Sequence, residues 1–252
     1  MIIKILAYLD QIEQKYNVRI IYAAEAGSRV WGYSTPTSDH DVKFIFVHPK
    51  KEYLKISEPK DVITEKFEDI EFEGWDIKKA LKLLYASNAS LFEWCYSPIE
   101  YCRKPIFDDF IALLGDCYDR RKVAYHYVKL SKKKIAEIGE KDNISPKDYL
   151  FAFRASVAAK WAVSRTDFPA LNIETLMDVM LIDEETRDEV EDLKSKRLSH
   201  QTIDRSSLLD MHMGIMNFCT EGELVCGSRD FIMERTDVEK LNTAFQNIVE
   251  RY

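Results

Sequence analysis

Two aspartates separated by one residue stand just before an apolar run near the start of the chain. Asp39-His40-Asp41 leads directly into the run 42–47. The side chains of a strand alternate between its two faces, so Asp39 and Asp41 are expected to point the same way. Two carboxylates held side by side repel each other, and a divalent metal ion offsets that repulsion. The pattern therefore predicts a metal site. In the simpler alternative, both aspartates serve only the turn after Pro36.

A glycine turn precedes this pair. Gly27-Ser28 follows the strand-like run 18–24, with ten residues between Ser28 and Asp39. Because glycine has no side chain to obstruct the backbone, the N–H groups of such a turn can hold phosphate oxygens. Nucleotidyl transfer mainly requires that phosphates be positioned and their charge neutralised. Metal ions held by carboxylates supply that neutralisation. The turn and the aspartates together favour chemistry on a nucleoside triphosphate.

Further carboxylates occur in a predicted strand and at the start of the helix after it. Alternation in the run 67–73 places Ile70 and Phe72 on one face and Glu71 and Glu73 on the other. The following residue, a glycine, is expected to end the strand. Asp76 precedes a helix predicted over 77–85, where an aspartate caps the first turn by accepting its backbone N–H groups.

The spacing of apolar residues predicts an α/β (α+β) protein whose second half is helical. Strands are expected at 18–24, 42–47, 62–63 and 67–73, with helices at 2–16, 77–85 and 91–96. Further helices are expected at 106–118, 120–138, 146–165, 173–180, 184–197, 204–217 and 235–251. We therefore expect a small mixed-sheet domain over 1–105, followed by an α-helical domain over 106–252 that covers its cleft.

The composition is that of a globular protein with no global attraction for nucleic acid. Of 252 residues, 46% are hydrophobic and 12% aromatic, and the net charge is −7. The apolar start is interrupted by Lys4 and Asp10, so it is too short for a signal peptide or a membrane span. The five cysteines form no Cys-x-x-Cys pair, which is typical of reduced thiols. These features predict a cytoplasmic protein without a membrane segment.

The pattern of Gly27-Ser28 followed by Asp39-His40-Asp41 resembles the signature of the DNA polymerase β-like nucleotidyltransferase superfamily. One branch is more similar still, the RlaP/YcgL-type "RNA repair pathway DNA polymerase β" family. The residues that carry this closer resemblance are Gly27-Ser28-Arg29, Gly32, Ser38-Asp39-His40-Asp41, the run Gly-Trp-Asp-Ile-Lys-Lys-Ala-Leu at 74–81, Ser87-Asn88, Glu93-Trp94, Ser97-Pro98 and the stretches 125–127, 147–154 and 159–161. The resemblance fades after about Leu176.

The resemblance implies roles for the residues of the two motifs. Asp39 and Asp41 would bind two Mg²⁺ ions (or Mn²⁺). Gly27 and Ser28 would hold the β- and γ-phosphates of an NTP such as ATP, with Arg29 close enough to help.

The superfamily also uses a third carboxylate on a neighbouring strand, which binds the catalytic metal or takes the proton of the acceptor. Glu71 suits this layout because it lies in mid-strand, although a glutamate departs from the usual aspartate. Asp76 is the second candidate, and it is equally explained as a helix cap. The sequence leaves the choice between them open.

Three basic residues are further candidates for phosphate contacts. Lys43 shares the face of the two aspartates, and it either touches phosphate or pairs with a carboxylate. Lys147 and Arg154 lie seven residues apart and share a helix face, from which they would reach a phosphate or else form surface salt bridges. His40 is expected to pack on the opposite face of its strand rather than to bind metal.

The stretch 120–134 combines basic residues with aromatic ones. Its basic members are Arg120, Arg121, Lys122, Lys129, Lys132, Lys133 and Lys134, interleaved with Tyr125, His126 and Tyr127. Such a surface can bind the backbone of RNA or DNA and stack its bases. A solvated helix face has the same composition, so both interpretations stay open.

Together these observations predict Mg²⁺-dependent transfer of a nucleoside monophosphate from an NTP to an acceptor hydroxyl, with release of pyrophosphate. The family name makes an RNA or DNA end the leading acceptor. Two alternatives keep the same residues. In one, the acceptor is a protein side chain or a small molecule such as an antibiotic. In the other, the protein is a regulator that binds an NTP without turnover.

Overall fold

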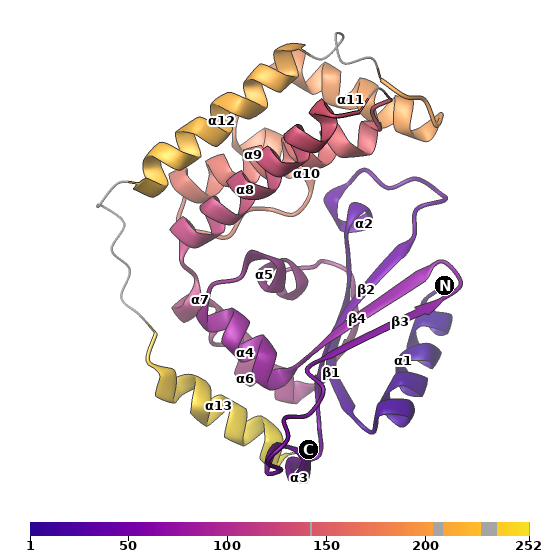
Figure 1. Cartoon of the computed structure of the whole chain (residues 1–252), viewed down its shortest axis with the longest axis vertical. Coiled ribbons are helices and arrows are strands. Elements are labelled where there is room, and N and C mark those ends of the chain that lie inside the picture. Colours follow the sequence, from indigo (N-terminus) through magenta and orange to yellow (C-terminus); the bar gives the residue numbers. More distant parts are fainter. Residues whose placement is uncertain (142, 204–208, 228–235, 252) are drawn as a thin grey trace. The chain divides into compact units, whose positions relative to one another are not determined.

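The structure is a computed structural model, and it describes residues 1–141, 143–203, 209–227 and 236–251. Within these residues, a five-stranded mixed sheet with helices forms the N-terminal part, and a mostly helical region follows (Figure 1). The predicted α/β (α+β) class is therefore confirmed. No helix of the described residues has the length and the hydropathy to cross a membrane.

The chain divides into two compact units whose segments alternate along the sequence. The sheet unit contains Met1–Val30, Ser38–Tyr118 and the described residues 236–251. The helical unit contains Trp31–Thr37 and the described residues from Asp119 to 227. The boundary predicted after residue 105 falls inside a segment of the sheet unit, and the last helix of the chain also belongs to that unit.

The sheet unit is built on five strands in the order β3-β4-β2-β1-β5. The strands are β1 (Arg19–Ala26), β2 (His40–Val47), β3 (Val62–Phe67), β4 (Ile70–Asp76) and β5 (Glu100–Arg103). Strands β2 and β4 run parallel, and every other neighbouring pair is antiparallel. The parallel pair at the centre of the sheet brings the start of β2 beside the start of β4.

Several helices complete this unit. They are α1 (Ile2–Tyr16), α2 (Ser28–Trp31, whose last residue belongs to the helical unit), α3 (Lys50–Tyr53), α4 (Ile77–Tyr85), α5 (Ala89–Cys95), the 3₁₀ turn η1 (Pro105–Phe107), α6 (Asp108–Ile111), α7 (Leu114–Cys117) and α13 (Val238–Glu250). Helix α1 lies on one face of the sheet, and α4 and α5 lie on the other (Figure 1).

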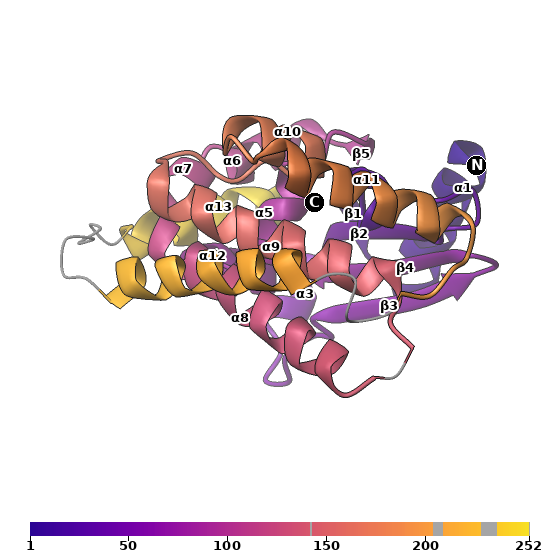
Figure 2. The same cartoon turned by 90° about the horizontal axis from the view of Figure 1, so that it is seen from above.

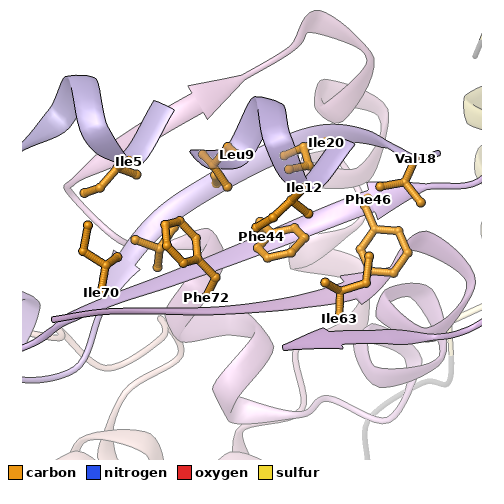
Figure 3. Packing of buried hydrophobic residues seen from close by; sticks show 12 residues of the cluster. Ile5, Leu9, Ile12, Val18, Ile20, Phe44, Phe46, Ile63, Ile70 and Phe72 are labelled. Atoms are coloured by element: carbon orange, nitrogen blue, oxygen red, sulfur yellow. The ribbon is translucent and has the colours of Figure 1, made fainter. Parts of the chain in front are cut away.

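The core of this unit lies between α1 and the sheet. Ile5, Leu9 and Ile12 recur at helical spacing, so they form one stripe on α1. Figure 3 shows this stripe against side chains of the central strands, among them Phe44 and Phe72. These core side chains occupy one face of β2 and β4, so the residues between them, including Asp41 and Glu71, lie on the opposite face.

Strand β4 differs from the sequence prediction at both ends. Phe67 belongs to β3, and the chain turns at Glu68, whose φ is 55°. Gly74 does not end the strand, which continues to Asp76. A Cβ on Gly74 would lie 2.0 Å from Cε2 of Phe44, so glycine is needed here because the ring covers the strand. The expectation that Gly74 breaks the strand was wrong because this contact lies outside any local pattern.

Two other parts of the sheet unit were also predicted incorrectly. The helix expected at 106–118 is three short pieces, η1, α6 and α7. Strand β5 was not predicted, because its residues show no alternation long enough to recognise. It pairs with the edge of β1.

The helical unit contains α8 (Arg120–Gly139), α9 (Pro146–Ser164), α10 (Ile173–Val179), α11 (Glu184–Leu198) and α12 (Leu209–Gly227). Helices α8, α9 and α12 lie side by side (Figure 2). The buried hydroxyl of Ser131 on α8 donates to the Ala152 carbonyl of α9 at 2.9 Å. A Cβ at Gly222 of α12 would lie 2.8 Å from Val128 Cγ2, so α12 packs closely on α8. The helices predicted at 204–217 and 235–251 begin in residues outside the described part of the chain.

Candidate active site

The aspartate pair lies at the start of β2. Asp39 is exposed and directly precedes the strand, and Asp41 is half-buried. Val42 and Phe44 point into the core beneath α1, so Asp41 leaves the sheet on the opposite face. As predicted, His40 faces away from Asp41, and its Nδ1 lies 2.7 Å from Oε2 of Glu25.

The Gly27 turn packs directly against the carboxylate of Asp41. Gly27 has a φ of +69°, and a Cβ at this position would lie 2.2 Å from Asp41 Oδ2. Any side chain here would collide with the carboxylate and would also strain the backbone. Helix α2 begins at the next residue, Ser28, which is buried. The predicted phosphate turn and one predicted metal ligand are therefore in contact.

Arg29 fixes the loop that leads to the aspartates. Its Nη2 donates to the carbonyl of Ser38 at 2.6 Å, and its Nε donates to the carbonyl of Asp39 at 3.2 Å. The Arg29 side chain thus ties helix α2, which begins just after the Gly27 turn, to the residues that lead into β2. A contact between Arg29 and phosphate stays a prediction, whereas its two hydrogen bonds to the loop before β2 are observed.

Glu71 is the register partner of Asp41. The two residues face each other across the parallel pair β2–β4, where strands are about 4.8 Å apart. The Glu71 side chain is 51% exposed and accepts from Lys66 Nζ at 2.8 Å. This hydrogen bond, and then the charge of Glu71, raise the pKa of Lys66 above its ordinary value. The charge of Asp39 also contributes to the raised pKa.

Asp76 lies at the other end of the same strand pair. It is the register partner of Phe46, five positions from Asp41, or about 16 Å along the strand. It is 2% exposed, accepts the backbone N–H of Lys78 at 2.8 Å and accepts the hydroxyl of Tyr53 at 2.5 Å. Burial raises the pKa of its carboxyl group above the ordinary value. The predicted helix cap is confirmed, and the structure does not bring Asp76 to the two aspartates.

Lys43 shares the face of Asp41 and pairs with a carboxylate. Its Nζ lies 3.0 Å from Oε2 of Glu73, which also accepts from the indole N–H of Trp75 at 3.1 Å. Trp75 in turn stacks on Trp94 of α5 with ring centroids 3.7 Å apart. The structure therefore gives Lys43 the simpler of its two predicted roles.

Sequence reasoning missed Glu25, a buried acid beside the site. Its carboxylate accepts the backbone N–H of Asp41 at 2.6 Å and contacts His40, and it also accepts the hydroxyl of Tyr101. It therefore ties the start of β2 to β1, two residues before Gly27. An acid inside the otherwise apolar run 20–26 was the signal available in the sequence.

The similarity to a known family extends over almost the whole chain and is not confined to the residues of the site. The sequence profile of the RNA repair pathway DNA polymerase beta family, RlaP, matches residues 1–243. The chain belongs to the RlaP family. The resemblance seen in the motifs is thus confirmed, and the family is a polymerase β-like nucleotidyltransferase family linked by its name to RNA repair.

Two individual proteins are similar to this RlaP member. YcgL of Bacillus subtilis (strain 168) is 29% identical over 251 aligned positions, and the alignment covers 98% of this chain and 96% of YcgL. A crystal structure of a nucleotidyltransferase-like protein from Exiguobacterium sibiricum 255-15 aligns with 96% of this chain and 88% of its own. That alignment has 11% identity and a TM-score of 0.30.

The superfamily to which RlaP proteins belong is typically Mg²⁺-dependent, so the carboxylates of the site are candidate metal ligands. Their chemistry fits, because Mg²⁺ prefers hard carboxylate oxygens. Asp41 and Glu71 are register neighbours, and Asp39 precedes them on an exposed loop. As the side chains of the described residues stand, however, no three His, Cys, Asp or Glu groups form a metal-ligand cluster. Glu71 would have to exchange Lys66 for a metal ion.

The two predicted phosphate contacts of the helical unit differ in exposure. Lys147 is exposed in the first turn of α9, where the Ser145 side chain caps the helix. Arg154 is 2% exposed, and its Nε donates to the carbonyl of Leu171 at 2.8 Å. The two side chains therefore do not form a common surface. Tyr149, which lies between them on α9, is fully buried.

The basic stretch 120–134 lies on α8, and part of it is engaged by acids. Lys132 pairs with Glu223 at 2.6 Å, and Lys134 pairs with Glu137 at 2.7 Å. Tyr125 is 49% exposed, and Lys129 lies over its ring at 4.7 Å. A cavity of about 560 Å³ between α8 and α12 is lined by Asp119, Arg121, Lys122, Tyr125, Glu223, Cys226 and Gly227. Nucleic-acid binding there stays a prediction.

Proposed function

We propose that this protein is a Mg²⁺-dependent nucleotidyltransferase that moves a nucleoside monophosphate from an NTP to an acceptor hydroxyl. The observation that carries the proposal is the contact between Gly27 and Asp41. A Cβ at Gly27 would lie 2.2 Å from Asp41 Oδ2. A turn suited to phosphate oxygens therefore directly adjoins a carboxylate suited to a metal ion.

In the proposed reaction, an oxygen of the acceptor forms a bond to the α-phosphorus while the bond to the bridging oxygen of the β-phosphate breaks. Pyrophosphate leaves, and the acceptor proton passes to a carboxylate or to water. Gly27 and Ser28 hold the β- and γ-phosphates in this scheme, and Arg29 keeps the adjoining loop in place through its two carbonyl contacts. Glu71 is the candidate for the proton acceptor or third ligand because it adjoins Asp41 in the sheet.

The residues proposed to hold Mg²⁺ are Asp39, Asp41 and Glu71. When bound there, the metal would neutralise phosphate charge and lower the pKa of the acceptor hydroxyl. Glu25 contributes by fixing the strand that carries Asp41, since it accepts that residue's backbone N–H. Asp76 is left out of this set because its oxygens cap α4 and accept from Tyr53.

We propose an RNA or DNA end as the acceptor, because the family is linked by name to RNA repair. Arg121, Lys122 and Tyr125 line a cavity of the helical unit, and Tyr125 presents half of its surface. Such residues attract a phosphate backbone and stack on bases. The proposed nucleic-acid contact is therefore this part of α8, where Lys122 pairs with Asp119 only at 3.9 Å, rather than Lys132 and Lys134, which pair with acids at 2.6 Å and 2.7 Å.

The test is an incubation with Mg²⁺, each α-labelled NTP in turn and a mixed RNA pool. We expect label on RNA with the native chain and a loss of at least about a thousandfold in D39N/D41N, because two of the three proposed metal ligands are gone. The matched control is D188N, which makes the same change at an exposed helical position. It should leave the rate unchanged.

The place of the label also decides between acceptors. Label on the protein would replace RNA by a protein side chain as the acceptor, and label on an added small molecule would replace it by that class. NTP binding without label on any acceptor would contradict transfer and favour a regulator that binds nucleotide. Transfer that survives in D39N/D41N would contradict the proposed site.

A further inference from the structure

The segment between the two halves of the candidate site belongs to the helical unit. Trp31–Thr37 groups with the helices that follow residue 119, although its neighbours Val30 and Ser38 group with the sheet. This segment joins the Gly27-Ser28 turn to Asp39. Its conformation therefore limits where the two halves of the motif can lie relative to each other.

Trp31 is held by a buried arginine of α9. The Arg154 guanidinium carbon lies 4.6 Å from the centre of the Trp31 ring. The Arg154 side chain is itself held in place, because its Nε–H donates to the Leu171 carbonyl at 2.8 Å. Phe151, one turn earlier on α9, meets the same indole edge-on at 5.6 Å. The indole is thus fixed against two side chains of one helix.

Tyr33 is held in the same way by an arginine of α11. The Arg197 guanidinium carbon lies 5.2 Å from the centre of the Tyr33 ring, and Tyr33 is 4% exposed. Between the two aromatics, Gly32 has a φ of +86°, and a Cβ there would lie 2.6 Å from Nδ2 of Asn172. Asn172 is itself committed, because its side chain caps α10. Three helices therefore hold three consecutive residues of the segment.

Buried stacks of this kind are strong and specific for arginine. A cation over an aromatic face is attracted more when water is excluded from it, and Arg154 is 2% exposed. The flat guanidinium also stacks on the ring, which the compact ammonium of lysine does not. Arg154, expected from the sequence to reach a phosphate or to form a surface salt bridge, instead contacts Trp31 in the segment between the two motif halves.

We propose that Arg154 and Arg197 are positioning residues for the candidate site. By holding Trp31 and Tyr33, they fix the segment that links Ser28 to Asp39, while Arg29 holds its far end through the Ser38 and Asp39 carbonyls. The expected effect of these arginines on metal binding rests on the proposed function. Their effect on the segment 31–37 does not, because hydrogen exchange measures it without metal.

The experiment compares the full-length native chain with R154K, which keeps the charge but loses the planar stack. Mn²⁺ alone is the metal probe, followed by electron paramagnetic resonance. We expect its dissociation constant to rise about tenfold, the effect typical of residues that orient ligands. Amide hydrogen exchange, measured without metal or nucleotide, should become faster across 28–41.

W31L is the second variant, because Trp31 is only half-buried and its removal leaves Arg154 in place. It should reproduce both effects if R154K folds poorly. The matched control is R165K, at the residue that follows the last residue of α9. Arg165 is exposed and lies over Trp161 at 5.0 Å, so R165K makes the same substitution at an arginine–aromatic contact outside 28–41. It should leave Mn²⁺ binding and exchange across 28–41 unchanged.

The outcomes separate the two claims. Faster exchange together with weaker Mn²⁺ binding supports the positioning role. Unchanged exchange across 28–41, or faster exchange with unchanged Mn²⁺ binding, overturns it. If Mn²⁺ binding to the native chain does not depend on Asp39 and Asp41, the proposed function fails instead. The anchoring then stands if exchange is faster in R154K and W31L, and it falls if exchange is unchanged.

Discussion

Both ends of the β2–β4 strand pair carry carboxylates, and the two ends differ in what surrounds those groups. At the first end, Asp41 is half-buried and Glu71 is 51% exposed, with a surface lysine as its partner. At the second end, Asp76 is 2% exposed and accepts from a helix N-terminus and a tyrosine. The partner of Glu71 is a flexible side chain that a ligand can replace. The partners of Asp76 are fixed by the fold.

The comparison shows why residue type alone does not assign a role. Glu71 and Asp76 were equal candidates for the third carboxylate, and they lie on one strand only five residues apart. An odd separation puts them on opposite faces of the sheet. Glu71 therefore adjoins Asp41, whereas Asp76 serves α4.

Of the variants that test this difference between the two ends, the largest effect is expected at Glu71. E71Q keeps the size of the side chain but removes its charge, so we expect nucleotidyl transfer to fall about a thousandfold. Single-turnover rates with labelled NTP measure this loss. E73Q is the control, because Glu73 pairs with Lys43 farther along the same face. Equal losses in E71Q and E73Q would contradict a specific role for Glu71.

The next effect concerns the turn at the same end. G27A adds a methyl group where the nearest atom, Asp41 Oδ2, is 2.2 Å away. We expect transfer to fall about a hundredfold, since small displacements of reacting groups have such effects. Alanine is also strained at this positive φ, so G27A should lower the free energy of unfolding by about 1–2 kcal/mol. G115A adds a methyl group that meets no atom within 4 Å in the short helix α7, so it should leave transfer unchanged and should not lower the free energy of unfolding. A G27A protein with native transfer would show that the contact has no functional role.

At the second end, the expected effect is on stability and its pH dependence. Burial raises the pKa of Asp76 from its ordinary 3.8, so the folded state favours the neutral form. The stability contributed by this group is therefore present below pH 3.8 and is lost as pH rises through the folded pKa. D76N has no charge to bury. Its free energy of unfolding relative to the native chain should increase between about pH 4 and pH 7.

Urea unfolding at several pH values measures this difference. Asparagine can still cap α4, so transfer by D76N should stay within about threefold of native. A pH-independent difference in stability would contradict the burial effect. A large loss of transfer would show that Asp76 belongs to the active site after all.

The smallest effect is expected from the lysine at the first end. K66Q removes the ion pair between Lys66 and Glu71, an exposed pair of the kind that contributes little to stability. We expect no measurable change in thermal unfolding and Mn²⁺ binding that becomes about twofold tighter, because one competing cation is gone. Weaker Mn²⁺ binding in K66Q, measured by titration, would contradict the view that Lys66 competes with the metal ion for Glu71.

The local parts of this account could be predicted from the sequence, because they depend on neighbours along the chain. The alternation around Asp41, the cap at Asp76 and the opposite facing of His40 all follow from strand and helix periods. The amphipathic α1 was predicted with its observed bounds for the same reason.

The parts that failed depend on contacts between distant residues. Gly74 lies inside a strand because the Phe44 ring covers it, thirty positions away in the chain. Glu25 is buried because His40, Asp41 and Tyr101 satisfy it, and no spacing rule connects those residues. Arg154 was expected to reach a phosphate or to form a surface salt bridge, but it is buried and lies over the ring of Trp31, more than a hundred residues earlier in the chain.

The central claim is that metal binds at the Asp41 end of the strand pair and not at the Asp76 end. Titration of the native chain, D41N and D76N with Mn²⁺, followed by electron paramagnetic resonance, tests this most directly. Each variant replaces one carboxylate by its amide in the same pair of strands. We predict that D41N loses Mn²⁺ binding while D76N binds as the native chain does. Binding retained in D41N and lost in D76N would contradict the account.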